Sequence, residues 1–422
     1  MKSLFKQNIF TILTKCLVII LPFYVLIKVF FEHKLGIPKF GFFIKEFIIV
    51  LLFLSMIYEF YKVKKLPKFE LLDYLIFAYF WYWIFITLFN WLWLNSLLYW
   101  ARYDYMFFVV FLIFRHSKQF LEINTNKLLT IFIYSASISL LFSILIKFRI
   151  WEDALLLFWF TDYISNWTFN WNIPTYHWLE NSWIKRFQWI LDWPSAMWFF
   201  LILYSYVFVF LQKKKSEFYV FLFGILLFIL LILTYSRSAL LWVWTSFWIL
   251  FLFNIKTIYK HYKSHLIYLI IFWIIFTWIF WIIYKEKIKN IVFRTSSTKG
   301  HFDRMEIWID RFLEKPLWSW LAESGPAYRS IYPDKQTKED EQYYIPESWF
   351  VQQLTEWWII YFTLFLSVFW IILTKLYTRT KTIFALLLAI LVMNIFLHIF
   401  EATYLSILLF IFIWLFISKN YD

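Results

Sequence analysis

Glycine, cysteine and charged residues are all scarce in this chain of 422 residues. Its single cysteine, Cys16, excludes a disulfide framework and a thiolate metal site. Charged residues make up only 16% of the chain and hydrophobic residues 63%, in long runs, which excludes a soluble globule. The sequence also has no glycine-rich phosphate loop, no metal-spaced His/Cys/Asp cluster and no internal repeat. These absences leave a helical membrane protein that crosses the bilayer many times, for which we expect no metal and no cofactor.

The shortage of glycine coincides with an excess of tryptophan: 5 glycines against 28 tryptophans, where ordinary usage gives roughly thirty glycines. An aromatic belt at the membrane interface enriches tryptophan but does not remove glycine. Several tryptophans stand where turns favour glycine, because glycine tolerates positive φ; they are Trp167, Trp171, Trp193, Trp318 and Trp320. We therefore hypothesise that many tryptophans are UGA codons in an organism that decodes UGA as glycine. UGA at these five codons would support the hypothesis, and UGG would exclude it.

Apolar runs of membrane-spanning length predict an all-α polytopic membrane protein with about twelve transmembrane helices, in one membrane domain over residues 1–422. The predicted spans are Ile9–Phe31, Phe40–Tyr58, Leu71–Phe89, Leu97–Phe114, Leu128–Ile146, Pro194–Leu211, Phe218–Thr234, Ser238–Phe253, His265–Tyr284, Trp358–Thr374, Ile383–Phe400 and Tyr404–Ile417.

The net charge of +14 comes from short basic clusters between these spans, which membrane topology explains better than nucleic-acid binding. A basic loop follows every even-numbered span, as Lys213, Lys214 and Lys215 follow the sixth. The positive-inside rule then puts both termini in the cytoplasm and the chain in the cytoplasmic (inner) membrane. The two longest polar segments, the smaller loop 147–193 and the large loop 285–357, would both lie outside.

Four arginines are candidates for binding an anion at the outer face. Arg237 interrupts an apolar run within the turn from Thr234 to Ser238, and a cation near hydrocarbon depth usually faces a polar cavity. Arg186 precedes the sixth span, Arg304 lies in the large loop, and Arg102 opens the fourth span, where it can pair with Asp104. A guanidinium group suits a diphosphate because it is planar, always charged and bidentate. The alternatives are a snorkelling turn residue for Arg237 and structural salt bridges for Arg102 and Arg304.

The transfer of a group to an acceptor hydroxyl needs a base that deprotonates this hydroxyl. The large loop offers Glu347, His301 and Glu323. Glu347 directly precedes the return of this loop to the membrane, so we expect it to be the base or the group that orients the acceptor. A solvated loop carboxylate is the alternative for each acid.

Four stretches together resemble the O-antigen ligase and polymerase superfamily of bacterial membrane glycosyltransferases. They are Arg186-Phe187-Gln188-Trp189, Thr234-Tyr235-Ser236-Arg237-Ser238-Ala239, Pro316-Leu317-Trp318-Ser319-Trp320, and the segment from Glu347 to Gln352 that runs on to Glu356-Trp357-Trp358. Several glycines of the family patterns are tryptophan here. The loop histidine of the family is matched by Glu347, a departure that bears on the acceptor chemistry.

The resemblance implies a metal-independent, inverting transferase of cell-envelope polysaccharide biosynthesis. Its donor would be a glycan on an undecaprenyl-diphosphate carrier, and its partners would include membrane lipids but no nucleic acid. In the ligase version the acceptor is a lipid or a protein, and in the polymerase version it is another lipid-linked glycan. The rival is a non-enzymatic transporter or flippase of lipid-linked glycans, which does not need a large outer loop and usually has repeated halves.

The predicted topology can be tested with reporters fused at two loop positions. A reporter placed after Lys335 should register outside, and one placed after Lys214 should register inside. Opposite labelling of either fusion would contradict the assignment of the outer face, on which every predicted site depends.

Overall fold

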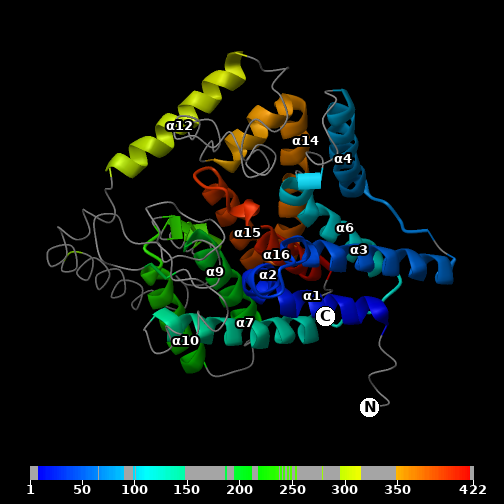
Figure 1. Ribbon diagram of the computed structural model, residues 1–422, viewed down its shortest axis with the longest axis horizontal. Helices are drawn as coiled ribbons and strands as arrows, with labels where there is room; N and C mark the ends of the chain where they lie inside the picture. Colours follow the sequence, from blue (N-terminus) through cyan, green and yellow to red (C-terminus); the bar gives the residue numbers. More distant parts are fainter. Residues whose placement is uncertain are drawn as a thin grey trace. The chain divides into compact units, whose positions relative to one another are not determined.

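The structure is a computed structural model that describes residues 8–64, 66–89, 98–99, 101–147, 186–187, 194–211, 217–236, 238–239, 241–242, 245–246, 248–249, 252–253, 278, 295–314 and 348–418. Every regular element in these residues is a helix (Figure 1). The five tryptophans at predicted glycine positions lie outside the described residues, as does nearly all of the smaller predicted loop, 147–193.

The chain forms two compact units, each described here by itself. Unit 1 comprises Met1–Trp81, Leu98–Ala239 and Ile399–Asp422, and unit 2 comprises Tyr82–Leu97 and Leu240–His398.

Unit 1 contains most of the described helices. They are α1 (Ile9–Ile20), η1 (Leu21–Phe23), α2 (Tyr24–Val29), η2 (Phe30–Lys34), α3 (Pro38–Val63), the first part of α4 (Leu71–Phe89), η3 (Ala101–Tyr105), α6 (Met106–Ser117), α7 (Thr125–Lys147), α9 (Pro194–Leu211), α10 (Glu217–Leu233), η6 (Ile399–Glu401) and α16 (Thr403–Ser418). Unit 2 contains α12 (Thr295–Glu314), α14 (Trp349–Arg379) and α15 (Lys381–Asn394).

Three helical segments are long and apolar enough to cross a membrane: Ile9–Glu32, Thr125–Leu145 and Ile359–Arg379. Five shorter apolar helices accompany them in the described residues. The prediction of a helical membrane protein is therefore confirmed at this level.

Most predicted spans fall on observed helices, and two have the same bounds: α4 covers Leu71–Phe89 and α9 covers Pro194–Leu211. The clearest difference is at the large loop. Helix α12 lies within it, and α14 begins at Trp349 instead of Trp358, because Ser348 caps the helix by accepting a hydrogen bond from Val351 N. Helix α15 ends at Asn394, before the predicted end at Phe400.

Helix α16 forms the centre of unit 1. It is apolar on all sides and buried from Thr403 to Phe416, as expected for a helix with no polar face. Its main neighbour is α6, and the ring of Phe410 lies 4.6 Å from that of Phe107. Side-chain packing of this kind drives helix association in a membrane, where the lipid is as apolar as the core.

Polar contacts of unit 1 collect at the two ends of its helices. At one end, which we call the Lys118 end, Asn8 bonds Glu59 at 2.7 Å, Arg115 bonds Asp73 at 2.7 Å, and Lys118 reaches the carbonyl of Ser418. At the opposite end, the Arg102 end, Arg102 contacts Tyr24, and Tyr24 stacks on Tyr404.

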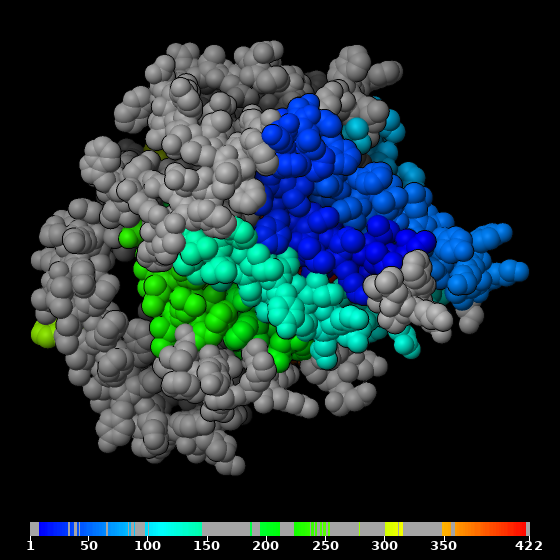
Figure 2. All heavy atoms as spheres, turned by 60° about the horizontal axis from the view of Figure 1, so that its bottom comes forward, coloured from blue at the N-terminus to red at the C-terminus, as the bar shows by residue number. Residues whose placement is uncertain are grey.

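Helix α9 runs towards the Lys118 end, and α10 runs back from it. Phe210, at the end of α9, packs on Phe416 near the Lys118 end, with ring centres 4.6 Å apart. Phe208 packs on Phe223, near the start of α10, with ring centres 3.8 Å apart. Helix α10 therefore ends at the Arg102 end of unit 1. Figure 2 shows α1 and α7, which contact each other, side by side on one face of this unit.

Candidate functional site

The end of α10 is fastened by a residue far away in the sequence. Arg186 Nε donates to the carbonyl of Thr234 at 2.9 Å, and Arg186 Nη2 donates to the carbonyl of Tyr235 at 3.4 Å. Beside it, Phe187 N donates to the carbonyl of Leu233 at 2.9 Å. The last carbonyls of a helix have no partner within the helix, and a cation there also interacts favourably with the helix dipole. Arg186 thus serves as a C-terminal cap from a distant segment.

The turn that follows this cap has a constrained backbone. Tyr235 has a φ of 50°, in the left-handed region. At the C-terminus of a helix the residue in this conformation is usually glycine. Such a conformation costs a side-chain-bearing residue about 1–2 kcal/mol and persists only where its surroundings fix it. The hydroxyls of Ser236 and Ser238 lie 2.7 Å apart, on either side of position 237. Arg237 itself lies outside the described residues.

We call residues Arg186, Phe187 and Thr234–Ala239 the arginine turn. Two predicted motifs that are separated by 48 positions, measured from Arg186 to Thr234, are hydrogen-bonded to each other here. The arginine turn therefore combines two hydroxyls, a strained backbone at Tyr235 and a capping guanidinium. A phosphate oxygen accepts hydrogen bonds from hydroxyl and guanidinium donors of this kind.

A second polar group, the ionic cluster, consists of Tyr24, Lys45, Glu46 and Arg102 at the Arg102 end of unit 1. Arg102 Nε lies 3.0 Å from Glu46 Oε1, and Arg102 Nη2 donates to the hydroxyl of Tyr24 at 2.7 Å. Lys45 pairs with the same Glu46 oxygen, and its ammonium lies 4.8 Å from the ring centre of Tyr24. The ion pair of Arg102 is therefore with Glu46. Asp104 is two positions from Arg102, and residues at this spacing on a helix do not face each other.

The ionic cluster holds more positive than negative charge. The side chains of Lys45 and Arg102 are 0% and 5% exposed, yet both cations share one oxygen of Glu46. Within the described residues Glu46 Oε2 has no hydrogen-bond partner. Arg102 also lies in η3, a π-helical turn, and such turns often occur at functional sites. Buried charge of this kind, between helices of a membrane protein, is itself a sign of function.

Our sequence reasoning missed Lys45 and Glu46, although the signal was present. Both residues lie inside the predicted span Phe40–Tyr58, and adjacent charges within an apolar span are a functional-site hypothesis by default. What the sequence did not reveal is their partner, because Arg102 is more than fifty positions away.

In unit 2 the structure brings two further candidates together. His301 and Arg304 are three positions apart on α12 and half-buried, and Trp308, four positions further on, is 1% exposed. At this spacing the three side chains share one face of α12, and α12 packs against α14.

The start of α14 carries the remaining predicted motif. Ser348 is its N-cap, and Gln352, one turn further on, is 2% exposed with no hydrogen-bond partner for its Oε1 within the described residues. A buried amide oxygen without a partner is costly, so Gln352 is an additional candidate for contact with a polar ligand. Glu347 and Glu323 lie outside the described residues.

Comparison of the chain with protein-family models, with curated proteins and with solved structures gives no match. The relation to the O-antigen ligase and polymerase superfamily therefore remains a prediction from motifs.

The shared oxygen in the ionic cluster predicts unequal effects of two substitutions. Glu46→Gln removes the carboxylate that Lys45 and Arg102 share, and breaking a buried ion pair typically costs about 3–5 kcal/mol of folding free energy. Lys45→Met leaves the ion pair between Glu46 and Arg102 in place and should lower the free energy of unfolding clearly less. The measurement is the unfolding midpoint of the purified variants in detergent. A Lys45→Met protein that is at least as destabilised as Glu46→Gln would show that Lys45 depends on another carboxylate.

Proposed function

We propose that the protein transfers a glycan from an undecaprenyl-diphosphate carrier to an acceptor at the outer face of the cytoplasmic membrane. The proposal includes the predicted membrane topology, with about twelve spans and both termini in the cytoplasm. In this topology the Arg102 end of unit 1 faces outwards.

One observation carries this proposal: Arg186 is hydrogen-bonded to the carbonyls of Thr234 and Tyr235. The predicted diphosphate-binding motifs thereby form one structural site, instead of two unrelated polar loops. The ionic cluster, with the predicted ligand Arg102, lies at the same end of the helices of unit 1, where the headgroup of a lipid carrier would be. Both features support an anionic ligand at this membrane face.

The proposed reaction is a displacement at the anomeric carbon of the donor glycan. The acceptor hydroxyl oxygen forms a bond to this carbon as the bond to the diphosphate oxygen breaks. The hydroxyl proton passes to a base, and the carrier leaves as free lipid diphosphate with the bonding electron pair. Fixed cations aimed at the developing charge of the diphosphate would lower the barrier.

Each residue then has a distinct role. Arg237 contacts the diphosphate, Arg186 positions the turn that presents Arg237, and Arg102 and Arg304 add positive charge. Glu347 is the proposed base, with His301 and Glu323 as alternatives in the same loop. A carboxylate needs a partly dry site to be basic enough near neutral pH, which a closing loop would provide.

The direct assay measures free lipid diphosphate released from a lipid-diphosphate glycan by the purified protein. Arg237→Lys keeps the charge but loses the bidentate fork, so release should fall by an order of magnitude or more. Arg379→Lys, at an exposed position at the end of α14, is the matched control and should leave release unchanged. Full turnover in Arg237→Lys and Arg237→Ala would remove Arg237 from the mechanism.

The same assay tests the base and separates the candidate functions. Glu347→Gln should bind the donor but transfer poorly, because the amide is not basic. Normal transfer by Glu347→Gln, together with loss in His301→Ala or Glu323→Gln, would move the base elsewhere in the loop. Release that needs a second lipid-linked glycan indicates a polymerase, and release that needs a lipid or protein acceptor indicates a ligase. Movement of the donor across the membrane without any release would favour the flippase.

A further inference from the structure

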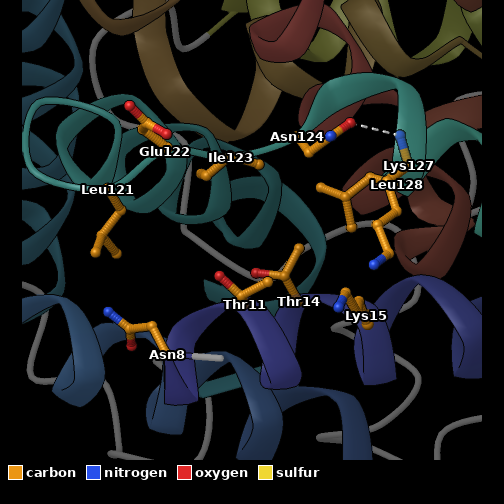
Figure 3. Close-up of a pocket in the computed structure, with 10 residues that line it drawn as sticks. All are labelled: Asn8, Thr11, Thr14, Lys15, Leu121, Glu122, Ile123, Asn124, Lys127 and Leu128. Atoms are coloured by element: carbon orange, nitrogen blue, oxygen red, sulfur yellow. Dashed lines mark hydrogen bonds between the residues drawn. The ribbon is translucent and has the colours of Figure 1, made fainter. Parts of the chain in front are cut away.

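Polar side chains that stabilise the fold have hydrogen-bond partners, as around a pocket of about 380 Å³ between the starts of α1 and α7 (Figure 3). The side chain of Asn8 accepts a hydrogen bond from Phe10 N at 3.0 Å. On the other side of the pocket, the side chain of Asn124 accepts one from Lys127 N at 2.9 Å. These bonds fix the starts of the two helices. A buried polar side chain that has no such bond needs a different explanation.

Gln352, one turn after the start of α14, is a buried side chain of this second kind. It is 2% exposed, and its Oε1 has no hydrogen-bond partner within the described residues. The next residue, Gln353, is 0% exposed, but each polar atom of its amide has a partner. Two neighbouring glutamines of similar burial therefore differ. The amide of Gln353 stabilises the fold, whereas the amide oxygen of Gln352 is an unused acceptor.

The start of α14 also has an unused donor. Helix geometry tilts the side chain of Gln352 towards this end of the helix, and the backbone N–H groups of the first turn point the same way. Val351 N donates to the hydroxyl of Ser348 at 3.3 Å. Phe350 N has no hydrogen-bond partner in the part of the chain that the structure describes, and Phe350 is half-buried. The start of α14 thus presents an acceptor and a donor at one helix end.

A hydroxyl group matches this combination best, because a hydroxyl donates one hydrogen bond and accepts others. A carboxylate or a phosphate diester has no proton to donate, so it would leave Oε1 of Gln352 without a partner. An ammonium group donates but does not accept, so it would leave the N–H of Phe350 without a partner. Carbohydrates present many hydroxyl groups, and they are therefore the class of ligand that this helix end fits.

The position of this helix end in the chain agrees with a carbohydrate ligand. Helix α14 begins where the large loop, predicted over residues 285–357, returns to the membrane, and α12 of this loop packs against α14. In the predicted topology the loop lies outside, on the side where a lipid-linked glycan and its acceptor would meet.

We propose that Gln352 binds a carbohydrate hydroxyl of the substrate, with its Oε1 accepting a hydrogen bond from this hydroxyl. Phe350 N donates to an oxygen of the same sugar. The inference rests on the proposed glycosyl transfer and adds to it a residue that recognises the sugar. In the free protein the unpaired oxygen lowers stability, and the sugar supplies its partner. A site of this kind rejects an analogue that lacks the hydroxyl, because the buried oxygen then stays unpaired.

The first measurement compares two leucine substitutions in the absence of substrate. Gln352→Leu replaces an unpaired buried amide by an apolar side chain, so the unfolding midpoint in detergent should be unchanged or higher. Gln353→Leu breaks existing hydrogen bonds and leaves their partners unpaired, so it should lower the midpoint by several degrees. An equal loss of stability in the two variants would show that Gln352 stabilises the fold and would overturn the proposal.

The second measurement separates the glycan from its carrier. The affinity of the full-length protein is measured for a lipid-diphosphate glycan and for undecaprenyl diphosphate, which carries no sugar. Gln352→Leu should bind the lipid-diphosphate glycan at least tenfold more weakly than wild type, and undecaprenyl diphosphate equally well. Gln353→Leu, measured below its unfolding midpoint, is the matched control and should have wild-type affinity for both lipids.

The release assay distinguishes the two substrates that carry hydroxyl groups. Wild-type affinity of Gln352→Leu for both lipids, together with a tenfold higher acceptor concentration for half-maximal release, would assign the hydroxyl to the acceptor. Wild-type values in both assays would overturn the role of Gln352 and leave the proposed transfer intact. Failure of wild-type protein to bind either lipid would instead contradict the proposed function itself.

Discussion

The capping of α10 by Arg186 is the interaction on which the account of the site depends. The end of a helix leaves carbonyls without partners inside the helix. Here the guanidinium of Arg186, from a distant segment, donates hydrogen bonds to the carbonyls of Thr234 and Tyr235. The same bonds hold the backbone of Tyr235 in a conformation that a residue with a side chain rarely adopts. A single guanidinium therefore caps the helix and also fixes the backbone of the two residues that follow it, Thr234 and Tyr235.

Buried charge in unit 1 is kept apart from the middle of its helices. Phenylalanine and other apolar side chains pack the middle, as α16 does against α6, whereas ion pairs and capped helix ends occupy the two ends. A charge at the centre of a bilayer is costly, and this arrangement avoids that cost. It also gives the two ends different chemistry: a shared carboxylate oxygen and capped carbonyls at the Arg102 end, and the ion pairs of Arg115 with Asp73 and Glu70 at the Lys118 end.

The sequence predicted local structure better than it predicted partners. The bounds of α4 and α9 follow from continuous apolar runs that end at polar residues or begin at proline, and such signals are local. The predicted span Trp358–Thr374 falls on the apolar segment Ile359–Arg379, but the helix itself already begins at Trp349, because the sequence reading did not recognise Ser348 as a cap ahead of the apolar run. The pairing of Arg102 with Glu46, and the docking of Arg186 on α10, join segments far apart in the chain, so no local pattern reveals them.

The central claim is that the arginine turn binds the diphosphate of a lipid-linked glycan. The most direct measurement is photo-crosslinking with a lipid-diphosphate glycan that carries a photoreactive group beside the diphosphate, followed by mapping of the labelled peptides. The account predicts label on the peptides that contain Arg186 and Thr234–Ala239, and its loss when unlabelled donor is in excess. Label that is absent from both peptides, or that excess donor does not reduce, would contradict the account.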